Sequence, residues 1–105
     1  MQPKALLEQV TSTIVARFHP KRIVVFGSYT RGDAHPDSDL DIFIEMDTLR
    51  RLPERAIEVS EVFGLRPWPL NIVVYTPEEV RRLSHVKGTL LSGIEREGRV
   101  LYESC

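Results

Sequence analysis

The sequence predicts an α/β domain in which a small mixed sheet of three to four strands is flanked by helices. Short apolar runs bounded by glycine, proline or polar residues indicate strands at 23–26, 42–44 and 70–75. Around these runs, apolar residues at spacings of three and four indicate amphipathic helices. A chain of 105 residues suffices for one hydrophobic core, so we expect residues 1–105 to form a single domain.

The first helix is predicted over residues 1–19. Pro3 suits a first helical turn, where its missing N–H has no partner to lose, and Pro20 excludes the residue before it from the helical region. One apolar stripe runs along this helix: Leu7, Val10, Ile14 and Phe18.

A strand buried on both faces is predicted at Ile23–Phe26, because four successive apolar residues end at Gly27. We expect this strand to be central in the sheet. The second strand, 39–46, has alternating side chains, so Asp39 and Asp41 project to one face. Phe43 shares that face, and we expect the helices to pack on the other. The residues predicted to pack inward are Leu40, Ile42 and Ile44.

Glu45 lies on the Asp41 face but about 13 Å further along the strand, at roughly 3.3 Å per residue. We therefore expect it to stay out of any site at Asp41 and to reach solvent. Residues 47–64 are predicted to be helical in two pieces, with the main helix starting at Pro53 and capped by Gly64. Its solvent face is predicted to be Glu54, Arg55, Glu58 and Glu61.

The third strand is predicted at 70–75, directly before a helix start. Thr76 as N-cap with Glu79 three residues later is the pattern of a capping box. A last helix is predicted over 89–98, with Leu90, Leu91 and Ile94 inward, and a short edge strand over 99–102.

Composition narrows the function classes. The net charge of −1 gives no electrostatic preference for nucleic acid. No apolar run approaches the roughly 18 residues of a membrane span, and no signal-peptide pattern opens the chain. The single cysteine, Cys105, offers no internal disulfide. We therefore expect a cytoplasmic protein without a membrane partner.

The stretch from Gly27 to Asp41 carries the chemistry. Two carboxylates on one face, Asp39 and Asp41, repel each other unless a cation or a shared proton relieves them. Mg²⁺ takes carboxylate oxygens together with substrate phosphates, so this pair predicts a divalent-metal site. Gly27 lacks the Cβ that would keep a phosphate from the backbone, and Ser28 supplies a hydroxyl.

This arrangement resembles the nucleotidyltransferase superfamily that includes DNA polymerase beta, and more closely its minimal, MNT-type members. The family pattern is Gly-Ser, ten residues, then Asp-x-Asp, with Arg-Gly after the Gly-Ser and Ser before the first Asp. The matching residues are Gly27-Ser28, Arg31-Gly32, Ser38, Asp39 and Asp41.

The resemblance implies transfer of a nucleoside monophosphate from ATP or a similar nucleoside triphosphate to a hydroxyl. It implies Mg²⁺ or Mn²⁺ on Asp39 and Asp41, and among minimal members an antitoxin whose acceptor is a small helical HEPN-type partner of a toxin–antitoxin pair. The residues that it implies for nucleotide binding are Gly27, Ser28, Arg31 and Ser38.

The sequence departs from the family at Asn71, where the resemblance places a third catalytic carboxylate. An amide carries no charge and cannot accept a proton as a carboxylate does. Two hypotheses follow. The chain is an active nucleotidyltransferase in which Asn71 completes the site, or it is a nucleotide-binding or partner-binding module with impaired catalysis.

Overall fold

The computed structural model describes residues 3–27, 39–64 and 70–104. The prediction of helices alternating with strands is confirmed over these residues. In chain order the elements are α1 (Pro3–Phe18), β1 (Arg22–Phe26), β2 (Leu40–Glu45), α3 (Leu52–Phe63), β3 (Leu70–Tyr75), α4 (Pro77–Leu83), α5 (Leu90–Glu97) and β4 (Arg99–Glu103).

The four described strands form one mixed sheet in the order β3-β2-β1-β4. β1 pairs antiparallel with both β2 and β4, whereas β2 and β3 run parallel. The predicted central place of Ile23–Phe26 and the predicted edge strand near residue 100 are therefore confirmed. The parallel pair requires a crossover, and α3 provides it between β2 and β3.

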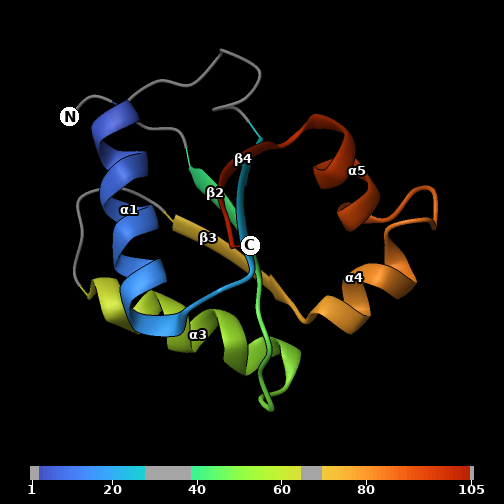
Figure 1. Cartoon of the computed structure of the whole chain (residues 1–105), viewed down its shortest axis with the longest axis horizontal. Coiled ribbons are helices and arrows are strands. Elements are labelled where there is room, and N and C mark those ends of the chain that lie inside the picture. Colours follow the sequence, from blue (N-terminus) through green and yellow to red (C-terminus); the bar gives the residue numbers. More distant parts are fainter. Residues whose placement is uncertain (1–2, 28–38, 65–69, 105) are drawn as a thin grey trace.

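Helices cover both faces of the sheet, with α1 and α3 on one side and α4 and α5 on the other (Figure 1). The expectation that helices pack only opposite the Asp pair is wrong. Its physical reason is Phe43, which shares the face of Asp41 and is fully buried. Together with Val24, it needs an apolar cover, and Leu91 and Ile94 of α5 supply it.

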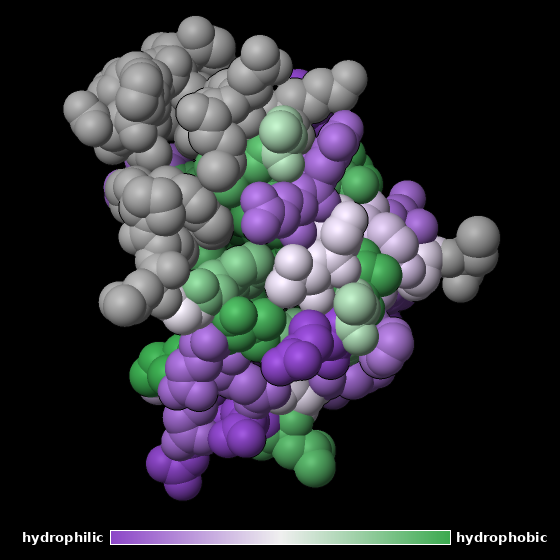
Figure 2. Space-filling view, turned by 90° about the vertical axis from the view of Figure 1, so that its left-hand side faces the viewer, coloured by the Kyte–Doolittle hydropathy of each residue, from purple (hydrophilic) through white to green (hydrophobic). Residues whose placement is uncertain are grey.

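The larger core lies under α1 and α3. Ile14 of α1 and Val59 of α3 are both fully buried there against strand residues such as Ile42. Figure 2 shows the outer surface on the α1 side, where hydrophobic side chains gather near the middle and hydrophilic ones below them. Within the described residues, no helix has the length and apolar character needed to cross a membrane.

Glu45 does not reach solvent as expected: it is only 5% exposed. The Arg22 Nε–H on the neighbouring strand donates to Glu45 Oε1 at 3.0 Å, and Lys21 Nζ lies 3.8 Å from the other oxygen. Arg22 also pairs with Glu95 on α5. Burial of this carboxylate is tolerated because a guanidinium hydrogen-bonds to it, and the same guanidinium ties α5 to the sheet.

Arg55 was expected on the solvent face of α3 but is buried, with 7% exposure. Its Nη1 donates to Glu79 Oε1 at 2.7 Å, and its Nε donates to the Arg50 carbonyl at 2.8 Å. Burial alone would raise the pKa of Glu79, but hydrogen bonds from Arg55 and from the backbone N–H of Thr76 lower that pKa below its ordinary value. The pair joins α3 to the start of α4.

Most helix ends follow the sequence signals, but the first of the two helical pieces predicted within residues 47–64 is wrong, because residues 46–51 are irregular and α3 starts at Leu52. Thr76 and Glu79 form the predicted capping box at α4, and Gly64 caps α3 with a φ of 55°. α5 starts one residue after its N-cap Thr89, and this places Leu90 in the first turn, where it is exposed. The prediction that Leu90 faces inward is therefore wrong, whereas Leu91 and Ile94 are buried as predicted.

Candidate active site

The candidate site lies where β1 ends and where β2 and β3 begin. In the parallel pair, Asp41 on β2 is opposite Asn71 on β3. In the antiparallel pair, Asp41 is opposite Phe26, the last residue of β1, so Gly27 follows directly beside it. Neighbouring strands lie about 4.8 Å apart, so Phe26, Asp41 and Asn71 form one row across the sheet, and Gly27 follows Phe26 at the end of β1.

The side chain of Asn71 joins the two aspartates. Its Nδ2 donates to Asp39 Oδ2 at 2.9 Å and to Asp41 Oδ1 at 3.0 Å. Because one amide group reaches both carboxylates, Asp39 and Asp41 project to the same face, as the alternation predicts. Asn71 also points to that cleft, as expected. Its nitrogen, rather than its oxygen, faces the carboxylates.

Gly27 is the other neighbour of Asp41. Its φ is +79°, and a Cβ built at this position would lie 2.2 Å from Asp41 Oδ2. Such a contact is far inside van der Waals distance, and L side chains rarely adopt this backbone conformation. The glycine therefore leaves the space that the carboxylate occupies. The space for Asp41 is thus a second explanation for a glycine at position 27, in addition to the predicted approach of a phosphate to the backbone.

A divalent cation fits this donor set in part. Asp39 is exposed, Asp41 is half-buried, and the Asn71 amide holds the two carboxylates side by side, which suits a hard cation that keeps several waters and substrate oxygens. Among the described residues, no group of three or more His, Cys, Asp or Glu side chains is placed to hold a metal ion. Glu45 is at the opposite end of β2, so its predicted exclusion from the site is confirmed.

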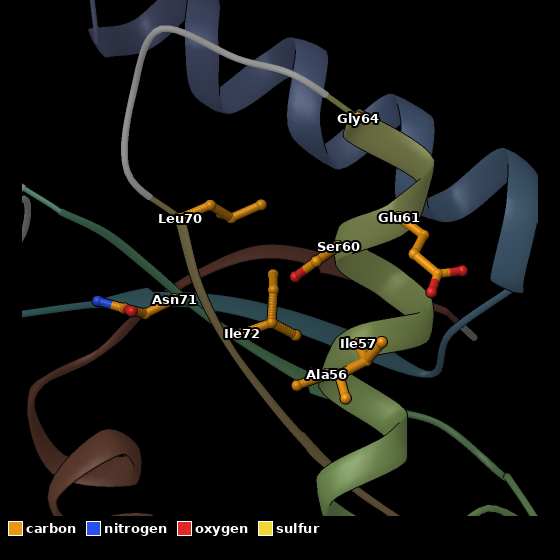
Figure 3. Close-up of a pocket in the computed structure, with 8 residues that line it drawn as sticks. All are labelled: Ala56, Ile57, Ser60, Glu61, Gly64, Leu70, Asn71 and Ile72. Carbon is orange, nitrogen blue, oxygen red and sulfur yellow. The ribbon is translucent and has the colours of Figure 1, made fainter.

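A pocket of about 590 Å³ lies between α3 and β3, on the other side of the strand. Figure 3 shows Ser60 pointing from α3 toward Leu70 and Ile72, whereas the Asn71 side chain points away from α3. The pocket and the carboxylates are thus on opposite faces of β3. We assign the chemistry to the carboxylate face, because the ligands suited to a metal are there.

Three of the residues predicted to bind nucleotide, Ser28, Arg31 and Ser38, lie outside the described residues. Their roles, and those of Gly27, Asp39, Asp41 and Asn71, therefore stay predictions. The contact between Arg55 and Glu79, which sequence reasoning missed, lies away from this cluster and serves the packing of α3 on α4.

Comparison with known proteins supports the resemblance. Residues 7–98 match the sequence profile of the family described as nucleotidyltransferase domain. The chain belongs to this family. The match includes α5, which covers the Asp41 face.

Relatives and solved structures agree with this assignment. This minimal nucleotidyltransferase is 38% identical over 71 residues to the protein adenylyltransferase MntA of Thermococcus cleftensis, covering 57% of this chain and 71% of the relative. Its fold is similar to that of a candidate nucleotidyltransferase from Sulfolobus solfataricus, with a TM-score of 0.64 and 19% identity over 94% of this chain and 78% of the other.

A second solved structure, of a toxin–antitoxin with AMP-PNP, has a TM-score of 0.63 and 22% identity over 93% of this chain and 73% of the other. At 19% and 22% identity, the similarity to these two structures shows the fold of the chain. They confirm the α/β nucleotidyltransferase architecture that the sequence predicts.

Proposed function

We propose that the chain transfers a nucleoside monophosphate from ATP, or a similar nucleoside triphosphate, to a hydroxyl group of a partner protein. The observation that carries the proposal is the convergence of Asp39 and Asp41 on the Asn71 amide, directly beside Gly27, in a chain that belongs to the nucleotidyltransferase family. The adenylyltransferase name of the relative supports ATP as the donor.

The proposed reaction is a displacement at the α-phosphorus of the nucleotide. The acceptor oxygen forms a bond to the α-phosphorus, the bond from that phosphorus to the bridging oxygen breaks, and pyrophosphate leaves. Mg²⁺ or Mn²⁺, when bound, supplies positive charge that stabilises the attacking and leaving oxygens. Asp39 and Asp41 would hold the ion, and Gly27 leaves the space that the Asp41 carboxylate occupies.

The proton of the acceptor hydroxyl needs a destination. Asn71 cannot take it, because an amide is not a base at neutral pH. Exposed Asp39, or water beside it, would receive the proton. We therefore propose slow or partner-dependent transfer, with the general-base contribution of about 10²-fold or more reduced.

The partner belongs to the same proposal. A toxin–antitoxin structure with this fold supports an antitoxin role, and a small helical HEPN-type protein would be the acceptor. The sequence signals for a cytoplasmic protein agree with a reaction that consumes ATP. A second candidate, a nucleotide-binding or partner-binding module with impaired catalysis, is favoured by the Asn71 nitrogen facing the carboxylates.

Intact mass spectrometry tests the proposal. The chain is incubated with Mg²⁺, ATP and the product of the neighbouring reading frame, and the partner is expected to gain the mass of one AMP. Asp39→Asn and Asp41→Asn keep the shape of each side chain and remove its charge, so both should abolish the gain. If binding of Mg²⁺–ATP is seen without any mass gain, the impaired-module candidate replaces the enzyme.

A further inference from the structure

We infer that Asn71 makes the cluster a site for one divalent cation rather than two, and that its amide holds both carboxylates in position for that ion. This inference rests on the proposed function. It concerns the number of cations that accompany the nucleotide and the group that positions their ligands. A metal count can therefore test it without any turnover.

The oxygens of the two aspartates are already divided between neighbours. An amide NH₂ has two hydrogens, and Asn71 gives one to Asp39 Oδ2 and the other to Asp41 Oδ1. The second oxygen of Asp41, Oδ2, lies against Gly27, at 2.2 Å from the position that a Cβ would take there. Asp41 thus presents one oxygen toward β1 and one toward β3.

A second cation would need oxygens on the β3 side. To provide them, the Asn71 N–H groups would have to leave both carboxylates, and the oxygen then turned toward the site would be neutral. Two carboxylates balance the charge of one divalent ion. A second ion would bring two more positive charges with no further protein carboxylate among the described residues to meet them.

The register keeps Asn71 at this position. β2 and β3 pair without a shift from Leu40 opposite Leu70 to Glu45 opposite Tyr75, so Asn71 stays opposite Asp41. The amide therefore acts like the outer hydrogen-bond partners that orient metal ligands in proteins. It relieves the repulsion between the carboxylates before an ion arrives and keeps them converged.

Manganese binding provides the test. Electron paramagnetic resonance of free Mn²⁺, titrated into the chain with a saturating non-hydrolysable ATP analogue, counts the bound ions. We expect one Mn²⁺ per chain for the wild type and two for Asn71→Asp. Asn71→Leu, which removes the donor without adding charge, should keep one ion and bind it about 10–100-fold more weakly.

Ser60→Asp is the matched control. It adds the same charge beside β3 but on the opposite face, where Ser60 points from α3 toward the strand (Figure 3). It should leave the count at one. Thermal unfolding checks that each variant folds, and Asn71→Asp should melt about 4–8 °C lower than wild type without metal, because a third carboxylate replaces a donor.

The outcomes separate the inference from the proposed function. Two Mn²⁺ ions in the wild type, a single ion in a folded Asn71→Asp variant, or unchanged affinity in Asn71→Leu would overturn the inference and leave the proposed function intact. No Mn²⁺ or analogue bound by either the wild type or Asn71→Asp would overturn the proposed function itself. If Asn71→Asp does not fold, the number of Mn²⁺ ions bound by the wild type alone decides whether the site holds one cation or two.

Discussion

Replacement of Gly27 by alanine tests whether the space beside Asp41 is needed for the site. At a φ of +79°, alanine costs about 1–2 kcal/mol of stability relative to glycine. For a domain of this size, each kcal/mol lowers the melting temperature by about 4–8 °C. In addition, the new Cβ would lie 2.2 Å from Asp41 Oδ2, so the carboxylate must move.

Gly88→Ala is the matched control. Gly88 has nearly the same backbone conformation, with a φ of +84°, but a Cβ there would have no atom within 4 Å. Both variants should therefore lose similar stability through backbone strain, and only Gly27→Ala should also lose the ligand effect. Differential scanning fluorimetry with and without Mg²⁺–ATP measures both quantities.

At a ligand concentration of about 100 times Kd, the wild type should gain about 2.7 kcal/mol from Mg²⁺–ATP. Gly88→Ala should keep this gain and Gly27→Ala should lose it. The reasoning is refuted if Gly27→Ala keeps the full gain. It is also refuted if Gly88→Ala loses the gain equally, because strain alone would then explain the effect.

Three further predictions concern Mg²⁺–ATP binding, Asn71 and Glu79. Mg²⁺ and ATP together should raise the melting temperature more than either alone, and an unchanged wild-type value with both at saturation would count against nucleotide binding. Asn71→Asp should speed transfer of labelled nucleotide to the partner, because it adds a base and an anion; equal rates would show that another group supplies the base. Glu79→Gln should cost about 1–3 kcal/mol at pH 7 in urea unfolding, because Arg55 loses a charged acceptor. Folding lowers the pKa of Glu79, so its charged form stabilises the protein above the ordinary value of 4.5, and this stabilisation is lost as pH falls through the folded pKa. The free energies of unfolding of the wild type and of Glu79→Gln should therefore become equal in acid. A difference that stays constant with pH would contradict this reasoning.

Much of the fold could be predicted from local pattern. The strands follow from apolar runs such as Ile23–Phe26, because consecutive apolar residues bounded by turn formers have few other arrangements. The capping box at Thr76 and Glu79 could be read directly, since both partners lie within one turn. The shared face of Asp39 and Asp41 follows from the period of two in a strand.

Contacts between distant segments could not be predicted this way. Alternation placed Glu45 on the correct face but could not show its burial, because its partner Arg22 is 23 residues away. The helical pattern likewise gave no sign that Arg55 pairs with Glu79, on a different helix. A charged residue is expected in water unless its partner is known, and the partner depends on tertiary packing.

In the candidate site, too, positions could be predicted from the sequence, whereas contacts between side chains could not. Pattern and resemblance together placed Asn71 beside the aspartates, and the strand register confirms that position. The direction of its amide could not be read from the sequence, because it depends on which atoms of Asp39 and Asp41 face it. The contact of Gly27 with Asp41 depends on the antiparallel pairing of β1 with β2.

We propose that a nucleoside monophosphate, rather than a phosphate, is transferred by means of Asp39 and Asp41. The most direct measurement compares ATP labelled at the α-phosphate with ATP labelled at the γ-phosphate, using the chain, Mg²⁺ and its partner protein. We predict that the α-label becomes covalently attached to the partner, that the γ-label leaves as pyrophosphate, and that Asp41→Asn prevents both. Attachment of the γ-label, or attachment of the α-label that persists in Asp41→Asn, would contradict the claim.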